Sequence, residues 1–478
     1  MRDLAYDIAE HLTQTPYAAL TQPALETARL DTLDTLGAAL AGSSAPACAE
    51  IVDLVAFWGG VQQSQVMVFG GRVPAPLATL ANTTMAHARE LDDTLDEAVL
   101  HAGVTVVPAA LAVAEALEAD GQTTLRAIAL GLDLVCRLGL ACTAPPGPTG
   151  WVLTSNLGVF ASAATAGMLL GLSESQMHNA LGIAYCQAAG NMQAVADAAM
   201  TKRLQVGLAA QAGVGAAYMA ARDISGAHEV FEGRHGYYKV YQRGRYDRNV
   251  VLNGLGTTFV HPQLSYKPYP SCRFTHGVID AALRIAERVQ PEDIESIEVA
   301  LTSAAHHSIV EPIAAKQRPR TIVDAQFSAP YTAAVALLRR EVRLEDFTSE
   351  AIEDARVLEL ASKVSCRADA QMDAERGRGI SPALVTVHLR GGSVERERQD
   401  WPLGHPNTPL GVDGLIAKFR RCAAHAAEPI PERSLDLVIE SCLGLEAAPR
   451  AAIVTELLVA TRTLLRQAQD ERVPSPSV

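Results

Sequence analysis

The chain has 478 residues, 49% hydrophobic and 19% charged, a balance typical of a folded globular protein. This length exceeds what one hydrophobic core usually organises, so we expect two domains. The formal net charge of −13 argues against nucleic acid or an anionic membrane as a partner, because both are bound by clustered lysine and arginine.

The cysteines and the N-terminus bear on metal binding and on the compartment. The eight cysteines are dispersed without a C-x-x-C pair, so the usual ligand spacing of zinc ribbons and iron–sulfur clusters is missing. We therefore expect reduced thiols, no metal and a cytoplasmic protein. Residues 1–10 lack the basic region and apolar run of a signal peptide. The apolar run 157–172 is shorter than the ~20 residues of a membrane span, so we expect a buried helix there.

From the N-terminus to about residue 265 the pattern is helical. Ser173 and Gln176 have the spacing of a capping box, which predicts a helix start. Asp120-Gly121 is expected to end the helix that begins near His101.

Beyond Lys267 the period changes to that of strands. Apolar residues alternate over 297–301 and again over 385–389, and the second run meets Gly391-Gly392 before residues 394–398. This pattern predicts a β-hairpin.

Helical patterns lie between these strands and follow them, so the expected fold is mainly α. A large helical domain, formed by both ends of the chain, would carry a smaller inserted α+β domain. The predicted boundaries are residues 1–266 with 403–465 for the helical domain, 267–402 for the α+β domain and 466–478 for a disordered tail.

Residues 86–101 form the most unusual polar segment. They place carboxylates, histidines and a threonine directly before an apolar run, namely Glu90, Asp92, Asp93, His87, His101 and Thr94. Carboxylates and imidazoles are rarely buried unless paired, so this grouping predicts a cleft wall where proton transfer takes place. The alternative is a charged loop that caps a core helix.

Two further segments carry cations where anions could bind. Lys202 and Arg203 open a run, residues 206–221, that is otherwise uncharged. Because a helix N-terminus already attracts anions, Lys202 would strengthen an anion site, although a surface pair is the alternative. Lys267 and Arg273 lie in a proline-spaced loop at the predicted domain junction, where clefts form, although a plain linker would show the same pattern.

Two hydroxyl groups are weaker candidates. Tyr331 lies beside an apolar helix, where core packing is the alternative. Thr154 either faces a pocket or caps the helix expected from Leu157. Lysines that hold an anion, a histidine that carries a proton and nearby carboxylates together suit proton removal next to a carboxylate, followed by loss or return of a β group.

Taken together, these segments resemble the MmgE/PrpD family, which includes 2-methylcitrate dehydratases, cis-aconitate decarboxylases and iminodisuccinate epimerase. The resemblance is carried by Ala86-His87 with Leu91-Asp92-Asp93-Thr94, by Lys267-Pro268-Tyr269-Pro270-Ser271-Cys272-Arg273 and by Asp324-Ala325-Gln326-Phe327-Ser328. It implies a large all-helical domain with an inserted α/β lid domain, a site at their junction, no cofactor and a homodimer.

The resemblance also implies site residues. His101 as proton carrier and Lys267 as carboxylate anchor follow from side-chain chemistry together with the resemblance. Thr94, Lys202 and Tyr331 match further family site residues. We therefore expect catalysis by His101, Lys267, Thr94 and Glu90, and substrate binding by Lys202, Tyr331, Thr154, Arg273 and Asp93.

The chain departs from the family pattern at several positions. Glu90 replaces an aspartate, and His101-Ala102-Gly103 replaces H-P-S. Val152 and Gln205 replace the histidines of G-x-H-P-T and K-x-L-H-A-G. Fewer cations leave substrate carboxylates less well neutralised, so we hypothesise a substrate less charged than 2-methylcitrate or cis-aconitate.

The sequence thus predicts a cofactor-independent lyase that dehydrates or decarboxylates a small carboxylic acid. Two alternatives stay open. One is an epimerase of the iminodisuccinate type, which would use the same proton abstraction without a leaving group. The other is a non-catalytic, carboxylate-binding homologue that lost its activity together with the two histidines.

Overall fold

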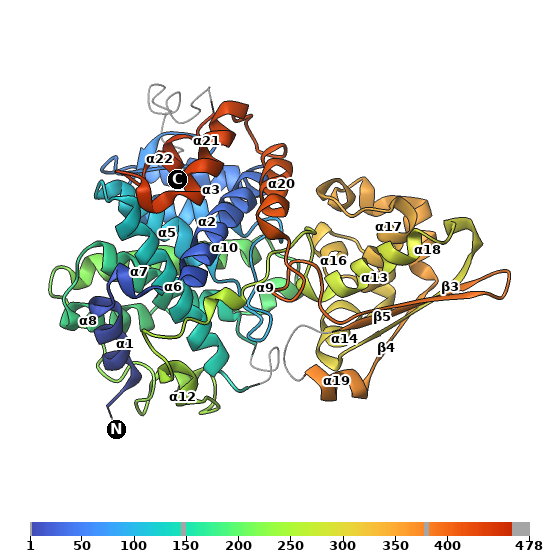
Figure 1. Ribbon diagram of the computed structural model, residues 1–478, viewed down its shortest axis with the longest axis horizontal. Coiled ribbons are helices and arrows are strands. Elements are labelled where there is room, and N and C mark those ends of the chain that lie inside the picture. Colours follow the sequence, from blue (N-terminus) through green and yellow to red (C-terminus); the bar gives the residue numbers. More distant parts are fainter. Residues whose placement is uncertain (1, 145–149, 377–381, 461–478) are drawn as a thin grey trace, which may run out of the picture.

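The computed structural model describes residues 2–144, 150–376 and 382–460, and the predicted disordered tail, residues 466–478, lies outside them. Figure 1 shows two bodies side by side, a large helical one and a smaller one that contains the main sheet. Helices dominate both, which confirms the mainly α class. The domain boundaries near residues 267 and 403 stay predictions.

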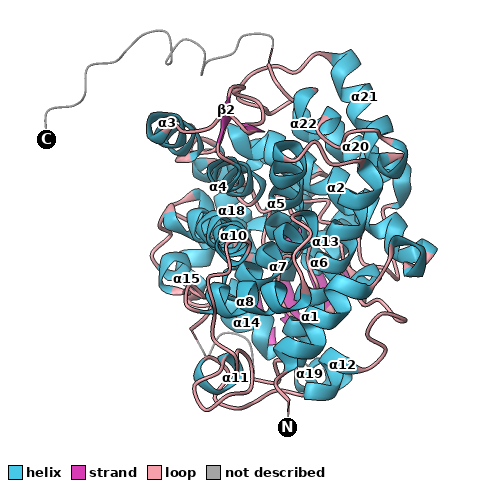
Figure 2. Cartoon of the chain, turned by 90° about the vertical axis from the view of Figure 1, so that its left-hand side faces the viewer, coloured by secondary structure: helices cyan, strands magenta, loops and turns pink. Residues whose placement is uncertain are grey.

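The large body draws helices from both parts of the chain. Figure 2 shows the returning helices α20, α21 and α22 grouped near α2. The helices of this body are α1 (Leu4–Gln14), α2 (Gln22–Ser43), α3 (Cys48–Trp58), α4 (Ala75–Ala86), α5 (Gly103–Ala116), α6 (Gly121–Ala141), α7 (Leu153–Leu169), α8 (Glu174–Tyr185), α9 (Gln193–Ala196), α10 (Thr201–Ala220), α11 (Tyr237–Val240), α12 (Arg248–Leu252), α20 (Gly411–Ala423), α21 (Glu432–Leu443) and α22 (Ile453–Glu456). A two-stranded antiparallel ladder, β1 (Ser64–Gln65) and β2 (Arg72–Val73), accompanies them.

Helix α7 lies in the core of the large body. Every residue from Thr154 to Leu169 is buried, which confirms the buried helix predicted there. Gly158 lets α7 approach α5 closely, because a Cβ at this position would overlap Thr105. Among the described residues, no single helix is long and apolar enough to cross a membrane, and that test is met only by α2 and α3 taken together, which meet at 96°.

The smaller body is built on a four-stranded sheet in the order β4-β3-β5-β6. Strands β3 and β4 run parallel and the other neighbours run antiparallel, with Val299 of β3 between Cys366 and Val385. The predicted hairpin is confirmed as β5 and β6. The strands are β3 (Ile294–Leu301), β4 (Val364–Ala368), β5 (Ala383–Leu389) and β6 (Val394–Gln399).

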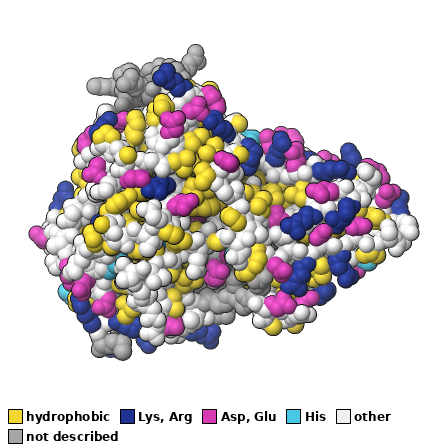
Figure 3. Space-filling model, viewed as in Figure 1, with side chains coloured by type: hydrophobic (Ala, Val, Ile, Leu, Met, Phe, Trp, Pro, Cys, Tyr) yellow, Lys and Arg dark blue, Asp and Glu magenta, His cyan; other side chains and the backbone are white. Residues whose placement is uncertain are grey.

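Helices α13 and α17 contribute to a second hydrophobic core that includes the buried residues of β3 and β5. On the face shown in Figure 3, positive and negative side chains are interspersed over this body. Arg288 of this body pairs with Glu395 and Glu397. The helices are α13 (His276–Ala286), α14 (Ser303–Ile309), α15 (Ile313–Gln317), α16 (Ile322–Gln326), α17 (Ala329–Arg339), α18 (Ala355–Ser362) and α19 (Ala370–Arg376). Short 3₁₀ turns occur in the two bodies at Tyr17–Ala19, His261–Gln263, Arg273–Thr275, Pro291–Asp293, Leu344–Phe347, Ala351–Glu353 and Leu445–Ala447.

Two expectations about helix ends have different outcomes. The capping box of Ser173 and Gln176 is confirmed at the start of α8. The helix that follows His101 ends at Ala116, earlier than predicted, because Glu118 takes a left-handed φ of 53° that a continuing helix does not allow. Asp120 instead begins the next helix, where its side chain accepts the N–H of Thr123 at 2.7 Å.

The backbones of Tyr266 and Gly404 lie side by side near the two predicted boundaries, where we expect the chain to cross between the bodies. The Tyr266 N–H donates to the Gly404 carbonyl at 2.9 Å. Gly404 has φ +88°, and a Cβ there would overlap the Tyr266 carbonyl oxygen. Glycine is therefore required at this crossing for two reasons, its conformation and the close approach of the backbones.

We expect Gly404→Ala to lower the free energy of unfolding by roughly 2–5 kcal/mol, since left-handed backbone and overpacking both destabilise. Gly392→Ala is the matched control. Gly392 also has a left-handed φ, +82°, but has open space around the Cβ position, so only about 1–2 kcal/mol should be lost. Urea unfolding of both variants measures the difference, and equal losses would contradict the crowding at Gly404.

Candidate active site

A cluster of charged side chains lies where the loop between α4 and α5 meets the chain entering the smaller body. The backbones of Thr94 and Ser265 exchange two hydrogen bonds of 2.8 Å. This pairing brings Lys267 next to a loop that lies far away in the sequence. We call the group formed by His87, Glu90, Asp92, His101, Lys202 and Lys267 the polar cluster.

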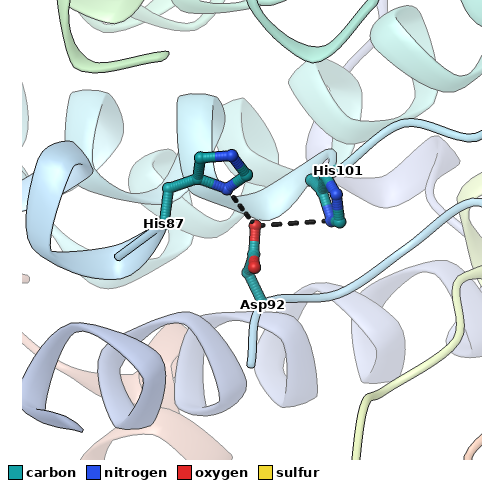
Figure 4. A group of neighbouring side chains, drawn as sticks. All are labelled: His87, Asp92 and His101. Atoms are coloured by element: carbon teal, nitrogen blue, oxygen red, sulfur yellow. Dashed lines mark hydrogen bonds and ion pairs between the residues drawn. The ribbon is translucent and has the colours of Figure 1, made fainter. Parts of the chain in front are cut away.

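Asp92 is the centre of the polar cluster, between the two histidines (Figure 4). Its Oδ2 atom lies 2.7 Å from Nδ1 of His87 and 3.3 Å from Nδ1 of His101. Its Oδ1 atom lies 3.7 Å from Nζ of Lys267. Although burial acts in the opposite direction, His101, His87 and Lys267 together hold the pKa of Asp92 well below its usual range. Asp92 is therefore a buried carboxylate that orients its neighbours.

His101 is the member of the polar cluster that reaches solvent most, with 18% of its side chain exposed. Its Nδ1 atom lies 2.5 Å from the carbonyl oxygen of Asp93 and 3.3 Å from Oγ1 of Thr94. A carbonyl oxygen only accepts, so Nδ1 carries the proton and Nε2 keeps a free electron pair. Burial lowers the pKa of His101, which favours the neutral ring. A neutral ring in this state can accept a proton through Nε2.

Two lysines flank the carboxylate of Glu90. Lys202 forms an ion pair with Oε1, and Nζ of Lys267 lies 3.5 Å from Oε2. Glu90 has a left-handed φ of 57°, a strained conformation of the kind found at functional sites. Lys267 is fully buried, and its Nζ has no hydrogen-bond partner among the described residues. These lysines could therefore bind a substrate carboxylate.

Two predicted substrate-binding residues, Asp93 and Thr154, form hydrogen bonds with backbone N–H groups of the protein. Both carboxylate oxygens of Asp93 accept backbone N–H groups at the start of α5, those of Ala102 (2.9 Å) and Gly103 (3.0 Å). Thr154 lies at the start of α7, and its hydroxyl accepts the backbone N–H of His101 at 3.1 Å. These hydrogen bonds of Asp93 and Thr154 fix the backbone at and directly after His101.

The structure does not bring Arg273 or Tyr331 into the polar cluster. Arg273 pairs with Asp96 at 3.1 Å and donates to the Leu403 carbonyl at 2.9 Å, so it ties the two bodies together. The Tyr331 hydroxyl donates to the Asp346 carbonyl at 2.6 Å inside the core of the smaller body. Tyr331 is buried on α17, and its hydroxyl, the one polar atom of the side chain, is already hydrogen-bonded there.

His87 and Asp92 belong to the polar cluster, although we expected neither of them as an individual catalytic or substrate-binding residue. Both stood in the motif that carries the family resemblance, and their spacing of five residues at a helix end was the available signal. Together with His101 they offer three ligand atoms within 4.8 Å of one another, which is a possible metal site. However, Nδ1 of His101 donates to a carbonyl and Lys267 adds a positive charge, so an ion-pair cluster fits these groups better than a cation site.

Behind Asp92, a returning helix supports the loop. Lys418 of α20 is buried, with Nζ 2.6 Å from Oδ1 of Asp34 and 2.5 Å from the Leu91 carbonyl. Asp34 lies on α2, so two distant parts of the chain fix the residue that precedes Asp92.

The protonation of His87 makes a prediction about stability. Burial and nearby Lys202 lower the pKa of His87 from 6.5 to about 3. Between these values the unfolded chain binds a proton that the folded chain does not, so this stability is present above pH 6.5 and is lost as the pH falls towards 3. Asparagine can still donate to Asp92 but does not titrate. We therefore expect the free energy of unfolding of His87→Asn to fall less steeply with decreasing pH than that of the parent, by up to about 1.4 kcal/mol per pH unit.

Urea unfolding between pH 7 and pH 4.5 measures this slope for the parent protein and the variant. His228→Asn, at an exposed histidine, serves as the control and should keep the parent slope. Identical slopes for the parent protein and His87→Asn would contradict a buried, neutral His87.

Comparison with known proteins relates almost the whole chain to one family. The model of the MmgE/PrpD N-terminal domain matches residues 6–248, and that of the MmgE/PrpD C-terminal domain matches residues 269–444. A cis-aconitate decarboxylase of Aspergillus terreus is 27% identical over 91% of each chain, and that of Homo sapiens is 28% identical over 92% of this chain and 91% of its own. A 2-methylcitrate dehydratase of Cupriavidus necator is 23% identical over 93% and 94%, respectively.

Proposed function

The chain belongs to the MmgE/PrpD family and is a lyase, and we propose that it acts on a small carboxylic acid by moving a proton at a carbon next to a carboxylate. One observation carries this proposal. A histidine whose Nε2 keeps its electron pair lies in the same cluster as a buried lysine whose Nζ has no hydrogen-bond partner in the described part of the chain.

Each member of the polar cluster has a role in this reaction. Lys267 and Lys202 hold the carboxylate and stabilise the enolate-like charge that develops beside it. In a dehydration, Nε2 of His101 takes the Cα proton and the C–H electron pair forms the double bond. Protonated His101 then gives this proton to the β-hydroxyl, which leaves as water. In a decarboxylation, the electron pair comes from the C–CO₂ bond, and protonated His101 returns a proton to carbon. Thr94 and Glu90 position His101 and the lysines.

We further propose a substrate with less negative charge than cis-aconitate or 2-methylcitrate. Lys202 and Lys267 already face the carboxylates of Glu90 and Asp92, so few positive charges remain for a substrate. Gln205 adds none, and its Oε1 accepts the N–H of Asn191 at 2.9 Å. A substrate with three carboxylates would leave at least one of them poorly neutralised.

Proton NMR of the purified protein in deuterated buffer tests both proposals. The panel comprises mono-, di- and tricarboxylic acids, including 2-methylcitrate, cis-aconitate and iminodisuccinate. Loss of a Cα proton signal together with a new product is expected for one of the less charged acids. Turnover of 2-methylcitrate or cis-aconitate at rates typical of enzymes would contradict the lower substrate charge and leave the lyase proposal intact.

The same spectra separate the alternatives. Deuterium that enters recovered substrate without a net product would indicate an epimerase. Binding without exchange or product would indicate a carboxylate-binding homologue.

We also propose that the reaction needs no cofactor and that the protein is a cytoplasmic homodimer. Protein that has been treated with a metal chelator and dialysed should retain its activity. Size-exclusion chromatography should show a dimer.

A further inference from the structure

Two arginines lie together just outside the polar cluster. Arg89 and Arg203 directly neighbour Glu90 and Lys202 in the sequence, and Glu90 pairs with Lys202. Both arginines reach the turn between α2 and α3. Nη2 of Arg89 donates to the carbonyl and the hydroxyl of Ser44, at 3.2 and 3.3 Å, and Nη1 of Arg203 donates to the Pro46 carbonyl at 3.0 Å.

Neither guanidinium has an acidic partner. Within the described part of the chain, no carboxylate oxygen comes within 4.0 Å of a guanidinium nitrogen of Arg89 or Arg203, whereas the buried Arg273 pairs with Asp96 at 3.1 Å. Burial and Arg203 both lower the pKa of Arg89, and the Nε atom of Arg89 is buried without a hydrogen-bond partner. Two half-buried like charges repel each other, so this arrangement favours a bound anion.

The backbone adds to the positive electrostatic potential of the two arginines. Helix α3, 11 residues long, begins at Cys48 directly after the turn, and no side chain caps it. Both guanidiniums act on the thiol of Cys48, where they oppose the effect of burial on its pKa. In the first turn of α3, the N–H of Cys48 donates to the Ala45 carbonyl at 3.2 Å and that of Ile51 to the Ala47 carbonyl at 3.1 Å. This helix start directly follows the turn that both arginines contact, and helix N-termini favour anions.

We propose that Arg89, Arg203 and the turn Ser44–Ala47 form a second oxyanion site, separate from the polar cluster, for a carboxylate or phosphate group. The planar, fork-shaped donors of two guanidiniums suit such a group better than a spherical anion. The ligand is either a phosphate-bearing metabolite or a free carboxylic acid, and the two share this chemistry.

Calorimetric titration of the full chain with inorganic phosphate, at constant ionic strength and neutral pH, tests the site. We expect saturable binding that weakens about 10-fold or more in Arg203→Gln and in Arg89→Gln, since each loses charge-assisted hydrogen bonds. Arg203→Lys, which keeps the charge but not the fork, should fall in between and remains informative where one glutamine variant does not fold. Arg222→Gln is the matched control and should bind like the parent, because the exposed Arg222, among the residues that the structure describes, donates only to the Tyr218 carbonyl.

A second titration with succinate identifies the source of the ligand. Binding of succinate through the same arginines supports a carboxylic acid, and binding of phosphate alone supports a phosphate-bearing ligand. Lys267→Met should retain the phosphate affinity of the parent. An affinity that is lost in Lys267→Met but unchanged in both arginine variants, or binding of neither anion, would overturn the proposal. The readout needs no turnover, so it stands apart from the outcome for the proposed reaction.

Discussion

Replacement of His101 by asparagine is expected to lower kcat by about 10²–10⁴-fold, the usual contribution of a positioned acid or base. The asparagine amide can still donate to the Asp93 carbonyl, which accepts a hydrogen bond from Nδ1 of His101 in the parent protein. It offers no basic nitrogen in place of Nε2, so the protein should fold normally and lose proton transfer. Steady-state kinetics on the acid that reacts in the NMR panel measures the loss.

The pH dependence of the parent enzyme belongs to the same prediction. Because burial lowers the pKa of His101 below 6.5, the neutral base is present at neutral pH and disappears as the pH falls through the lowered value. For a dehydration, kcat should therefore fall on the acidic side only. His228→Asn, at an exposed histidine, should keep the activity of the parent. Full activity of His101→Asn would remove His101 from the mechanism.

Lys267→Met is expected to lower kcat/KM by about 10²–10³-fold, similar to the loss of one donor that stabilises developing charge. Methionine has a similar length, so it fills the buried space without a charge. A raised KM with unchanged kcat would assign Lys267 to ground-state binding of the carboxylate, and a lowered kcat would assign it to the charge that develops in the reaction. We expect mainly the latter, because Nζ lies 3.5 Å from Glu90 and 3.7 Å from Asp92 but makes no hydrogen bond among the described residues, so it can donate to the oxygen on which charge develops.

The matched control for Lys267→Met is Lys239→Met, at an exposed lysine of α11, which should retain the parent activity. Thermal unfolding of both variants checks that Lys267→Met lowers kcat/KM through the reaction and not through a loss of folded protein. A kcat/KM within twofold of the parent would contradict the role of Lys267 as anchor.

Local structure could be predicted where a short stretch of residues decides it. The hairpin of β5 and β6 and the capping box at Ser173 depend on neighbours in the sequence, and both formed as expected. The early end of α5 was missed because the left-handed φ of Glu118 has no clear signature in a residue type that usually continues a helix.

The candidate site could be predicted only in part. Residues of segment 86–101 and the lysines had the right chemistry, and the family resemblance placed them in one site although more than 100 residues separate them. Side-chain orientation could not be predicted. Asp93 faces the backbone amides of α5, and Tyr331 faces the core of the smaller body, because of how whole helices pack. The same residue types would serve equally well in a pocket or in a core.

The ion pair of Lys418 and Asp34 also bears on the order of events during translation. These residues are 384 positions apart, and the loop that carries Asp92 is held through the same ammonium group. Chains fold progressively as they emerge from the ribosome. The loop that carries Asp92 therefore stays without this support until α20 has been synthesised and has packed against α2. A chain that ends before α20 would contain the residues of the polar cluster but not the lysine that holds this loop in place.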